Sequence, residues 1–254
     1  MATRSRWTNH TLERYDSITG EIVQRHTAVH LSDEFTSASG SVDESNGFTV
    51  STPGSDDAVE VLTGPGVGCA NLITGTADND TVAIHSRYNF LGSKSPSLQA
   101  ILCLDTKTVS AIGMGFATYT SVISNAGPLK QVDTSWTTTG TDLVGIHYDA
   151  LATTGTFWSI ATKTNVDATA VNSSVVPVDS TYNILRLDLV ENTSTTPDTV
   201  DAYCYIDGVL VATFSDAVNI NTLLRAYVAV SCRTAASIQP TGLVDKVDLW
   251  SDRA

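Results

Sequence analysis

The sequence predicts an all-β fold in the form of an antiparallel two-sheet sandwich, and three observations lead to this prediction. Threonine, valine and alanine are abundant whereas glutamate is scarce, and this composition suits pleated, half-buried strands better than helices. From residue 47 onward, short apolar or alternating runs recur about every 8 to 12 residues with turn residues between them, as in a sandwich or barrel. No segment sustains the periodicity of an amphipathic helix.

Ten segments carry the strand pattern, and each is short enough to form a single strand. In chain order they are Thr81–His85, Leu98–Leu104, Ser110–Ala117, Leu143–Tyr148, Thr156–Ala161, Tyr182–Val190, Thr199–Ile206, Val209–Phe214, Ala226–Cys232 and Val244–Trp250. The clearest turn is Asp207–Gly208, which suits a tight hairpin because both residues can adopt positive φ. The polar stretch Glu191–Asp198 is predicted to be a second hairpin loop.

Alternation along two of these segments assigns a buried and an exposed face. Between residues 185 and 189, three leucines alternate with an arginine and an aspartate, so this strand has one face in the core and one in water. Near the C-terminus, Val247 and Leu249 share one face, which leaves Trp250 on the other. A second layer or a partner must therefore cover the Trp250 ring.

The cysteines are predicted to be free thiols in the core. They are Cys69, Cys103, Cys204 and Cys232. No CxxC pair occurs and no histidine lies at metal-ligand spacing, so the pattern indicates neither a zinc site nor a dense disulfide framework. A Cys204–Cys232 disulfide across paired strands is the alternative, and it requires an oxidising compartment.

Residues 1–30 differ from the rest of the chain and are predicted to form an N-terminal arm, followed by a sandwich domain over residues 31–254. Four arginines in the arm outnumber its three carboxylates by one, whereas the whole chain carries a net charge of -13. An ordered arm of this kind needs a tether, and another protein chain is the plainest one. The alternative is that the arm folds back as an edge strand of its own domain.

The acidic balance limits the classes of partner. With a sequence pI near 4.5, the chain is not expected to bind nucleic acid or an anionic membrane, because both require a basic surface. No run approaches the roughly 18 to 20 apolar residues of a membrane-spanning helix. The arginines of the arm are not followed by the apolar core of a secretory signal, so we expect no export by that route.

Catalytic motifs are absent from the sequence, and we therefore expect no enzyme, no catalytic residue, no cofactor and no metal. No E-x-D-x-E run places two carboxylates on one strand face, and no G-x-S-x-G elbow frames a serine near His85 or His147. The stretch Gly64–Gly68 lacks the Lys-Ser/Thr of a phosphate loop and is predicted to be a turn. The aspartates near residues 56–57 and 78–80 could bind calcium, although a solvated turn explains them as well.

Several motifs follow one another in a consistent order. They are Gly75–Ile84, Lys94–Pro96, Leu98–Leu104, Ile112–Ala117, Gly145–Tyr148, Phe157–Ala161, Tyr182–Leu187, Tyr205–Ala212 and Val244–Trp250. This series resembles the concanavalin A-like jelly roll of tailed-phage virion proteins, and its last two members are also typical of laminin-G-like sandwiches. The resemblance extends over residues 31–253 and implies one large jelly-roll domain.

The resemblance also implies a function. It is closest to a capsid decoration or cement protein, which binds the major capsid protein on the outer surface of the virion after assembly in the host cytoplasm. The alternative is a tail-fibre or receptor-binding module that holds bacterial surface glycan in a shallow groove. The basic arm favours decoration, because an arm can lie along another shell protein by strand addition, whereas no coiled or repetitive stalk is present.

We further expect the chain to associate with itself as a homotrimer. Tyr203, Tyr205, Tyr227 and Trp250 are predicted to point outward, and together they give more apolar surface than a monomer usually exposes. The predicted partner-binding residues are Arg4, Arg6, Trp7, Leu12, Arg14, Tyr15 and Trp250.

Overall fold

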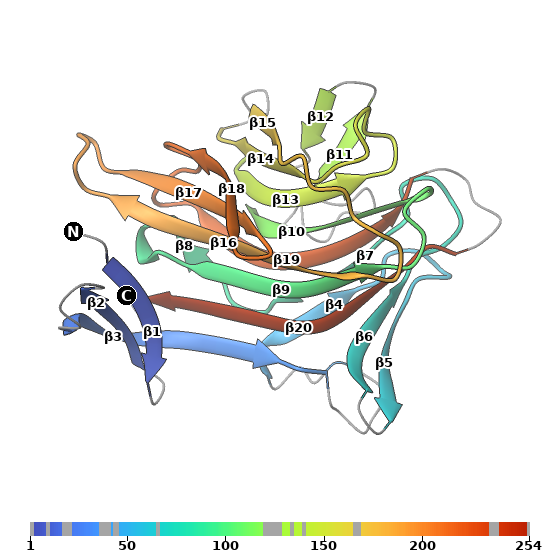
Figure 1. Cartoon of the computed structure of the whole chain (residues 1–254), viewed down its shortest axis with the longest axis horizontal. Helices are drawn as coiled ribbons and strands as arrows, with labels where there is room; N and C mark the ends of the chain where they lie inside the picture. Colours follow the sequence, from blue (N-terminus) through green and yellow to red (C-terminus); the bar gives the residue numbers. More distant parts are fainter. Residues whose placement is uncertain are drawn as a thin grey trace.

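The computed structural model describes residues 3–8, 11–16, 22–35, 42, 46–64, 67–118, 129–132, 135–138, 141–164, 169–233 and 239–252. Two antiparallel sheets and a separate hairpin make up this part of the chain (Figure 1), which contains no α-helix. Within the same ranges, no helix is long and apolar enough to cross a bilayer.

The strands form the sheets in the following orders. The ten-stranded sheet runs β1 (Thr3–Thr8), β2 (Thr11–Asp16), β3 (Ile22–Asp33), β20 (Thr241–Asp252), β9 (Ser97–Leu104), β16 (Tyr182–Asn192), β17 (Thr199–Ile206) and β18 (Val209–Phe214), and β6 (Val67–Ile73) also pairs with β20 and with β5 (Ala58–Gly64). The eight-stranded sheet runs β15 (Thr169–Asn172), β14 (Trp158–Thr162), β13 (Leu143–Asp149), β10 (Ser110–Thr118), β19 (Leu223–Cys232), β7 (Thr81–Ser86) and β4 (Phe48–Ser51), and β8 (Phe90–Leu91) pairs with β19. The separate hairpin consists of β11 (Leu129–Val132) and β12 (Ser135–Thr138).

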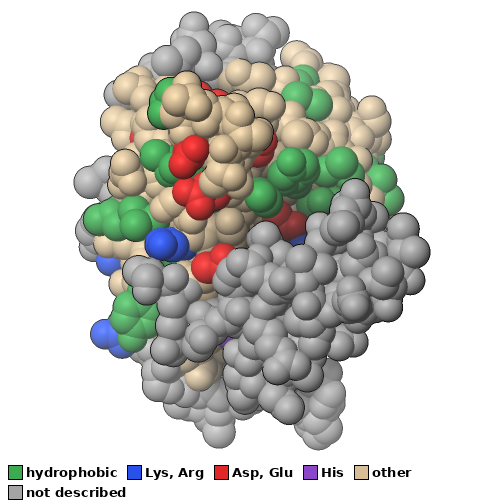
Figure 2. Space-filling model, turned by 90° about the vertical axis from the view of Figure 1, so that its left-hand side faces the viewer, with side chains coloured by type: hydrophobic (Ala, Val, Ile, Leu, Met, Phe, Trp, Pro, Cys, Tyr) green, Lys and Arg blue, Asp and Glu red, His purple; other side chains and the backbone are tan. Residues whose placement is uncertain are grey.

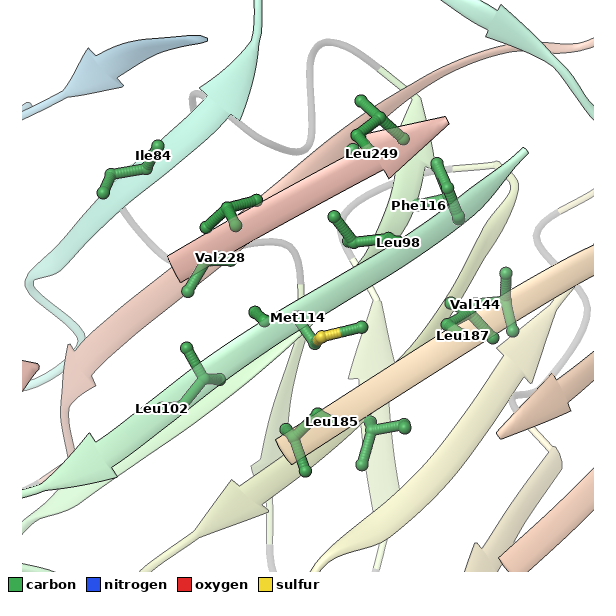
Figure 3. Close-up of a cluster of buried hydrophobic side chains, with 14 of the residues drawn as sticks. Ile84, Leu98, Leu102, Met114, Phe116, Val144, Leu185, Leu187, Val228 and Leu249 are labelled. Carbon is green, nitrogen blue, oxygen red and sulfur yellow. The ribbon is translucent and has the colours of Figure 1, made fainter. Parts of the chain in front are cut away.

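The core lies between the inner faces of the two sheets. Leu98, Leu187 and Leu249 enter it from the ten-stranded sheet, and Met114 and Val228 enter it from the eight-stranded sheet (Figure 3). Each such side chain contributes about 1.5 to 3 kcal/mol to stability when it is withdrawn from water. The predicted fold class, an antiparallel two-sheet jelly-roll sandwich, is therefore confirmed.

All ten predicted strands are present, and the predicted hairpin at Asp207–Gly208 is confirmed. Asp207 has φ 50° and Gly208 has φ 80°, the left-handed region that this tight turn requires. The predicted loop Glu191–Asp198 connects β16 to β17, as expected. The predicted turn at Gly64–Gly68 joins β5 to β6, with residues 65 and 66 outside the described ranges.

The N-terminal arm extends the ten-stranded sheet beyond the sandwich. The second half of β3, from Ala28 to Asp33, pairs with the end of β20, and its first half pairs with β2. Strands β1 and β2 therefore form a hairpin beside the C-terminal end of β20 (Figure 1). The predicted boundary between residues 30 and 31 lies inside β3.

None of the four cysteines, all of them described, forms a disulfide, and all are buried, as predicted. Cys204 lies on β17 of the ten-stranded sheet, whereas Cys232 lies on β19 of the eight-stranded sheet. The alternative of a disulfide across paired strands is therefore wrong, because the two strands belong to different sheets. Burial raises the pKa of the Cys204 thiol to about 12, so it remains protonated at neutral pH.

Candidate functional site

The outer face of the eight-stranded sheet is built around glycines on its central strands. Gly113 and Gly115 lie on β10 opposite His147 and Gly145 on β13. A Cβ atom at Gly145 would lie 2.8 Å from His147 Nε2 and 2.9 Å from Tyr227 Oη, and one at Gly113 would collide with the His147 ring. The glycines are needed because the two rings lie close against the sheet.

His147 and Tyr227 form a neutral pair on this face. His147 Nε2 and Tyr227 Oη are joined by a hydrogen bond of 2.7 Å. Burial lowers the pKa of His147 to about 3 and raises the pKa of Tyr227 well above its ordinary value, so neither group carries a charge at neutral pH. Tyr227 was expected to point outward, but only 1% of it is exposed because the face is covered.

Part of the cover comes from the separate hairpin. Trp136 on β12 contacts Trp158 on β14, with ring centroids 6.1 Å apart, and both rings pack on the cluster that contains Tyr227. His147 is 5% exposed. The described part of this face is therefore packed, and it offers no opening to a ligand at the His147–Tyr227 pair.

The aspartates considered for calcium accept hydrogen bonds from their own chain, Asp78 from Asn79 Nδ2 at 2.9 Å and Asp80 from the Ala77 N–H at 3.2 Å. Arg233 is buried and donates from Nε to Asp149 Oδ2 at 2.8 Å, and its Nη1 donates to Asn79 Oδ1. Asp57 accepts from the backbone N–H groups of two glycines at 2.6 and 2.7 Å. Within the described ranges, no group of three histidine, cysteine, aspartate or glutamate side chains is placed to hold a metal ion.

A groove of about 280 Å³ lies on the ten-stranded sheet, and we treat it as the candidate site. Its lining comes from β6, β9, β16, β20 and the segments that flank them. The lining residues are Asn71, Cys103, Asp105, Ser180, Tyr182, Thr241 and Leu243. The sheet register explains why they meet, since Tyr182 pairs with Cys103, Cys103 with Leu243, and Leu243 with Asn71.

Tyr182 is the aromatic wall of the groove. It is 43% exposed, so its ring can receive a ligand. Burial of the hydroxyl, together with the neighbouring Cys69, Cys103 and Asp245, raises the pKa of Tyr182 to about 12. The phenol is therefore neutral over the physiological range of pH.

The polar wall of the groove contains an amide and a carboxylate. Asn71 lies on β6, and its Oδ1 is buried without a hydrogen-bond partner. Asp105 is exposed just after β9, where its backbone N–H donates to the Thr241 carbonyl at 3.2 Å. On the opposite side, the Ser180 N–H donates to the Leu104 carbonyl at 2.7 Å. These backbone bonds fix the flanking segments and hold the wall in place.

A second cavity, of about 570 Å³, lies between the ends of β14 and β18. Threonine and serine hydroxyls line much of it, and Lys163 forms an ion pair with Asp216 in its wall. Phe214, the aromatic member of the described lining, is buried. This cavity therefore lacks the exposed aromatic surface that the groove has.

Of the predicted partner-binding residues, the side chain of Trp250 can be placed. It lies on the outer face of the ten-stranded sheet, half-buried, opposite Val247 and Leu249 in the core, as predicted. The Arg186 guanidinium lies 5.9 Å from the Trp250 ring centroid and 5.5 Å from that of Tyr205. Side chains of the same chain therefore cover part of the ring.

The other predicted partner-binding residues lie in the arm. Arg4, Arg6 and Trp7 are on β1, and Leu12, Arg14 and Tyr15 are on β2. Their side chains lie outside the described part of the structure.

On the described part of the face that Figure 2 shows, acidic and hydrophobic side chains lie side by side, with lysine and arginine mainly toward the left margin.

Comparison with known proteins identifies the fold. No family model and no curated protein matches this sequence. The carbohydrate recognition domain of Emp47p matches with a TM-score of 0.56 and 9% identity, over 88% of this chain and 95% of that one. A β-glucanase from Bacillus licheniformis matches at 0.54 and 12%, over 89% and 98% of the two chains. A β-1,3-glucanase from Mycobacterium marinum matches at 0.56 and 14%, over 86% and 97%.

These identities are low, so the matches show the fold alone, a concanavalin A-like jelly roll. They also correct one expectation. The prediction that the chain is not an enzyme does not stand, because two of these three similar structures are glucanases and the fold is therefore compatible with catalysis. Absence of the E-x-D-x-E spacing removes one arrangement of catalytic carboxylates and does not exclude activity on this architecture.

Proposed function

We propose that this chain is a carbohydrate-recognition protein and that the groove beside Tyr182 holds a sugar residue. One observation carries the proposal: an exposed tyrosine ring stands in the same groove as an amide, a carboxylate and two hydroxyls. This is the glycan-binding alternative that the sequence already suggested, and the fold of the Emp47p carbohydrate recognition domain is consistent with it.

The chemistry of a sugar fits these groups. A hydroxyl both donates and accepts, so one hydroxyl can donate to the Asp105 carboxylate while a neighbouring one accepts from the Asn71 amide. Ser180 and Thr241 add hydroxyls that can take either role. The apolar face of a pyranose ring can pack on the exposed Tyr182 ring, which supplies contact area at little cost in conformational entropy.

The size of the groove limits what it holds. Its volume of about 280 Å³ is just below the roughly 300 to 1,000 Å³ of drug-sized pockets, which suits one sugar residue and part of a second. Because the groove is open on an exposed sheet face, the rest of a glycan chain can continue into solvent. Recognition of an internal residue or of a chain end is therefore compatible with the geometry.

A binding measurement tests the proposal. Glycan-array screening of the full chain identifies the bound oligosaccharide, and calorimetry measures its affinity for the wild type and for Tyr182→Ala. We expect Tyr182→Ala to weaken binding about 5- to 30-fold, because an aromatic ring in a contact commonly contributes about 1 to 2 kcal/mol. Tyr88→Ala is the matched control, since Tyr88 is 58% exposed and is absent from the groove lining. Equal affinity for both variants and the wild type contradicts the proposal.

A second candidate function is decoration of a phage capsid, and the position of the arm favours it. Strand β1 stands at the end of the sheet order, and an edge strand of this kind can accept a strand from another protein. In this proposal the major capsid protein is the partner, the virion surface is the location, and three copies associate through Trp250.

Deletion of residues 1–21 tests this second candidate, because it removes β1 and β2 but leaves β3 on β20. We expect the shortened chain to stay folded and to lose binding to capsid particles in a sedimentation assay. Light scattering of the wild type and of Trp250→Ala tests the trimer. A monomeric wild type, or full particle binding without the two strands, contradicts the candidate.

A further inference from the structure

We infer that the groove beside Tyr182 prefers a hexosamine with a free, protonated amine over neutral and anionic sugars. This inference rests on the proposed function, and it adds the charge of the ligand. Three features of the groove carry it: the carboxylate in the lining, the further carboxylates around it, and the exposed aromatic ring.

Negative charge surrounds the groove. Asp105 lines it directly, and Asp179 stands nearby, where it accepts the Lys107 backbone N–H at 2.8 Å. Asp245 follows the β20 residues of the lining. The charges of Asp105 and Asp179 act on the groove wall. Burial is the main cause of the raised pKa of Cys103, and these two carboxylates raise it further.

Positive charge does not balance this field within the lining. The described lining contains no lysine or arginine. Lys107, a nearby cation, donates from Nζ to the carbonyl of Pro177 at 3.5 Å, and neither residue belongs to the lining. An anionic sugar would therefore meet like charges, and a cationic one would meet opposite charges.

An ammonium group also matches the remaining chemistry of the groove. It has three N–H donors and no acceptor, so it can donate to the Asp105 carboxylate in a charge-assisted hydrogen bond. It can also lie against the exposed face of Tyr182, where the ring quadrupole attracts a cation. N-acetylation removes the charge and one of the donors, and a carboxylate on the sugar reverses the charge.

Calorimetry with three defined oligosaccharides tests the inference: a glucosamine oligomer, the N-acetylglucosamine oligomer of equal length, and an oligogalacturonate. At pH 6 and low salt we expect the glucosamine oligomer to bind about tenfold more tightly than its acetylated form, the size of one hydrogen bond to a charged group. We expect the oligogalacturonate to bind most weakly. Asp105→Asn should weaken binding of the glucosamine oligomer more than binding of the acetylated oligomer, and so remove the preference.

Asp198→Asn is the control, because Asp198 is also exposed but lies in the loop between β16 and β17. It distinguishes the groove from general attraction to an acidic chain, so a preference that is unchanged by Asp105→Asn overturns the inference. Equal affinity for the glucosamine oligomer and the N-acetylglucosamine oligomer also overturns the inference, while it leaves the proposed function in place. Absence of binding by every oligosaccharide on the array and in calorimetry overturns both.

Discussion

Replacing Asn71 by leucine should stabilise the chain and weaken glycan binding. The Asn71 Oδ1 atom is buried without a hydrogen-bond partner, and such an atom costs about 1 to 3 kcal/mol of stability. Leucine has nearly the same shape and no polar atom, so we expect the free energy of unfolding to rise by about 1 kcal/mol. For a chain of this size that corresponds to an increase in Tm of about 2 to 4 °C. Binding should weaken because the groove loses its amide.

Chemical and thermal unfolding measure the first effect, and calorimetry measures the second. The matched control is Asn172→Leu, because the Asn172 amide is satisfied: Oδ1 accepts from Thr156 Oγ1 at 3.0 Å and from the Ser174 N–H at 2.7 Å. This control should destabilise the chain by about 1 to 3 kcal/mol. The reasoning is refuted if Asn71→Leu lowers stability as much as the control does, or if it binds glycan like the wild type.

Two further predictions concern stability. His147 has a pKa of about 3 in the folded chain against 6.5 when unperturbed, so the unfolded state binds more protons between these values. The free energy of unfolding should therefore fall by roughly 4 kcal/mol as the pH decreases from 6.5 to 3. Urea unfolding at several pH values checks this, and the slope should largely vanish in His147→Gln. Arg233→Met should cost about 3 to 5 kcal/mol, because it leaves the Asp149 carboxylate buried without its guanidinium partner. An equally stable variant in chemical denaturation would contradict it.

The sequence predicts the strands better than it predicts what covers them. Alternation correctly places the leucines of 185–189 and the pair Val247 and Leu249 in the core, because side chains point to alternate faces of a strand. The same rule places Tyr227 on an outer face and says nothing of the layer above it. Part of that layer comes from Trp136 on β12, whose position depends on packing between distant segments.

The groove could not be predicted for a related reason. Asn71, Asp105 and Tyr182 are separated by more than thirty residues along the chain, and they meet only because β20 brings β6 and β9 together. One signal was present: Tyr182 and Ile184 alternate with buried Leu185 and Leu187, which marks an exposed apolar stripe at the start of β16. Alternation identifies such a stripe, but only the structure shows that the Oδ1 atom of Asn71 is buried without a hydrogen-bond partner.

The two candidate functions use opposite ends of the same strand. Thr241 and Leu243, at the start of β20, line the groove, whereas residues 247–252, at its end, pair with the arm through β3. At about 3.3 Å per residue, the two regions are more than 10 Å apart along the strand. A glycan in the groove therefore leaves the edge of β1 open, and a partner on the arm leaves the groove open. Loss of one activity in Tyr182→Ala and of the other in the shortened chain would show a protein that connects a glycan to a particle.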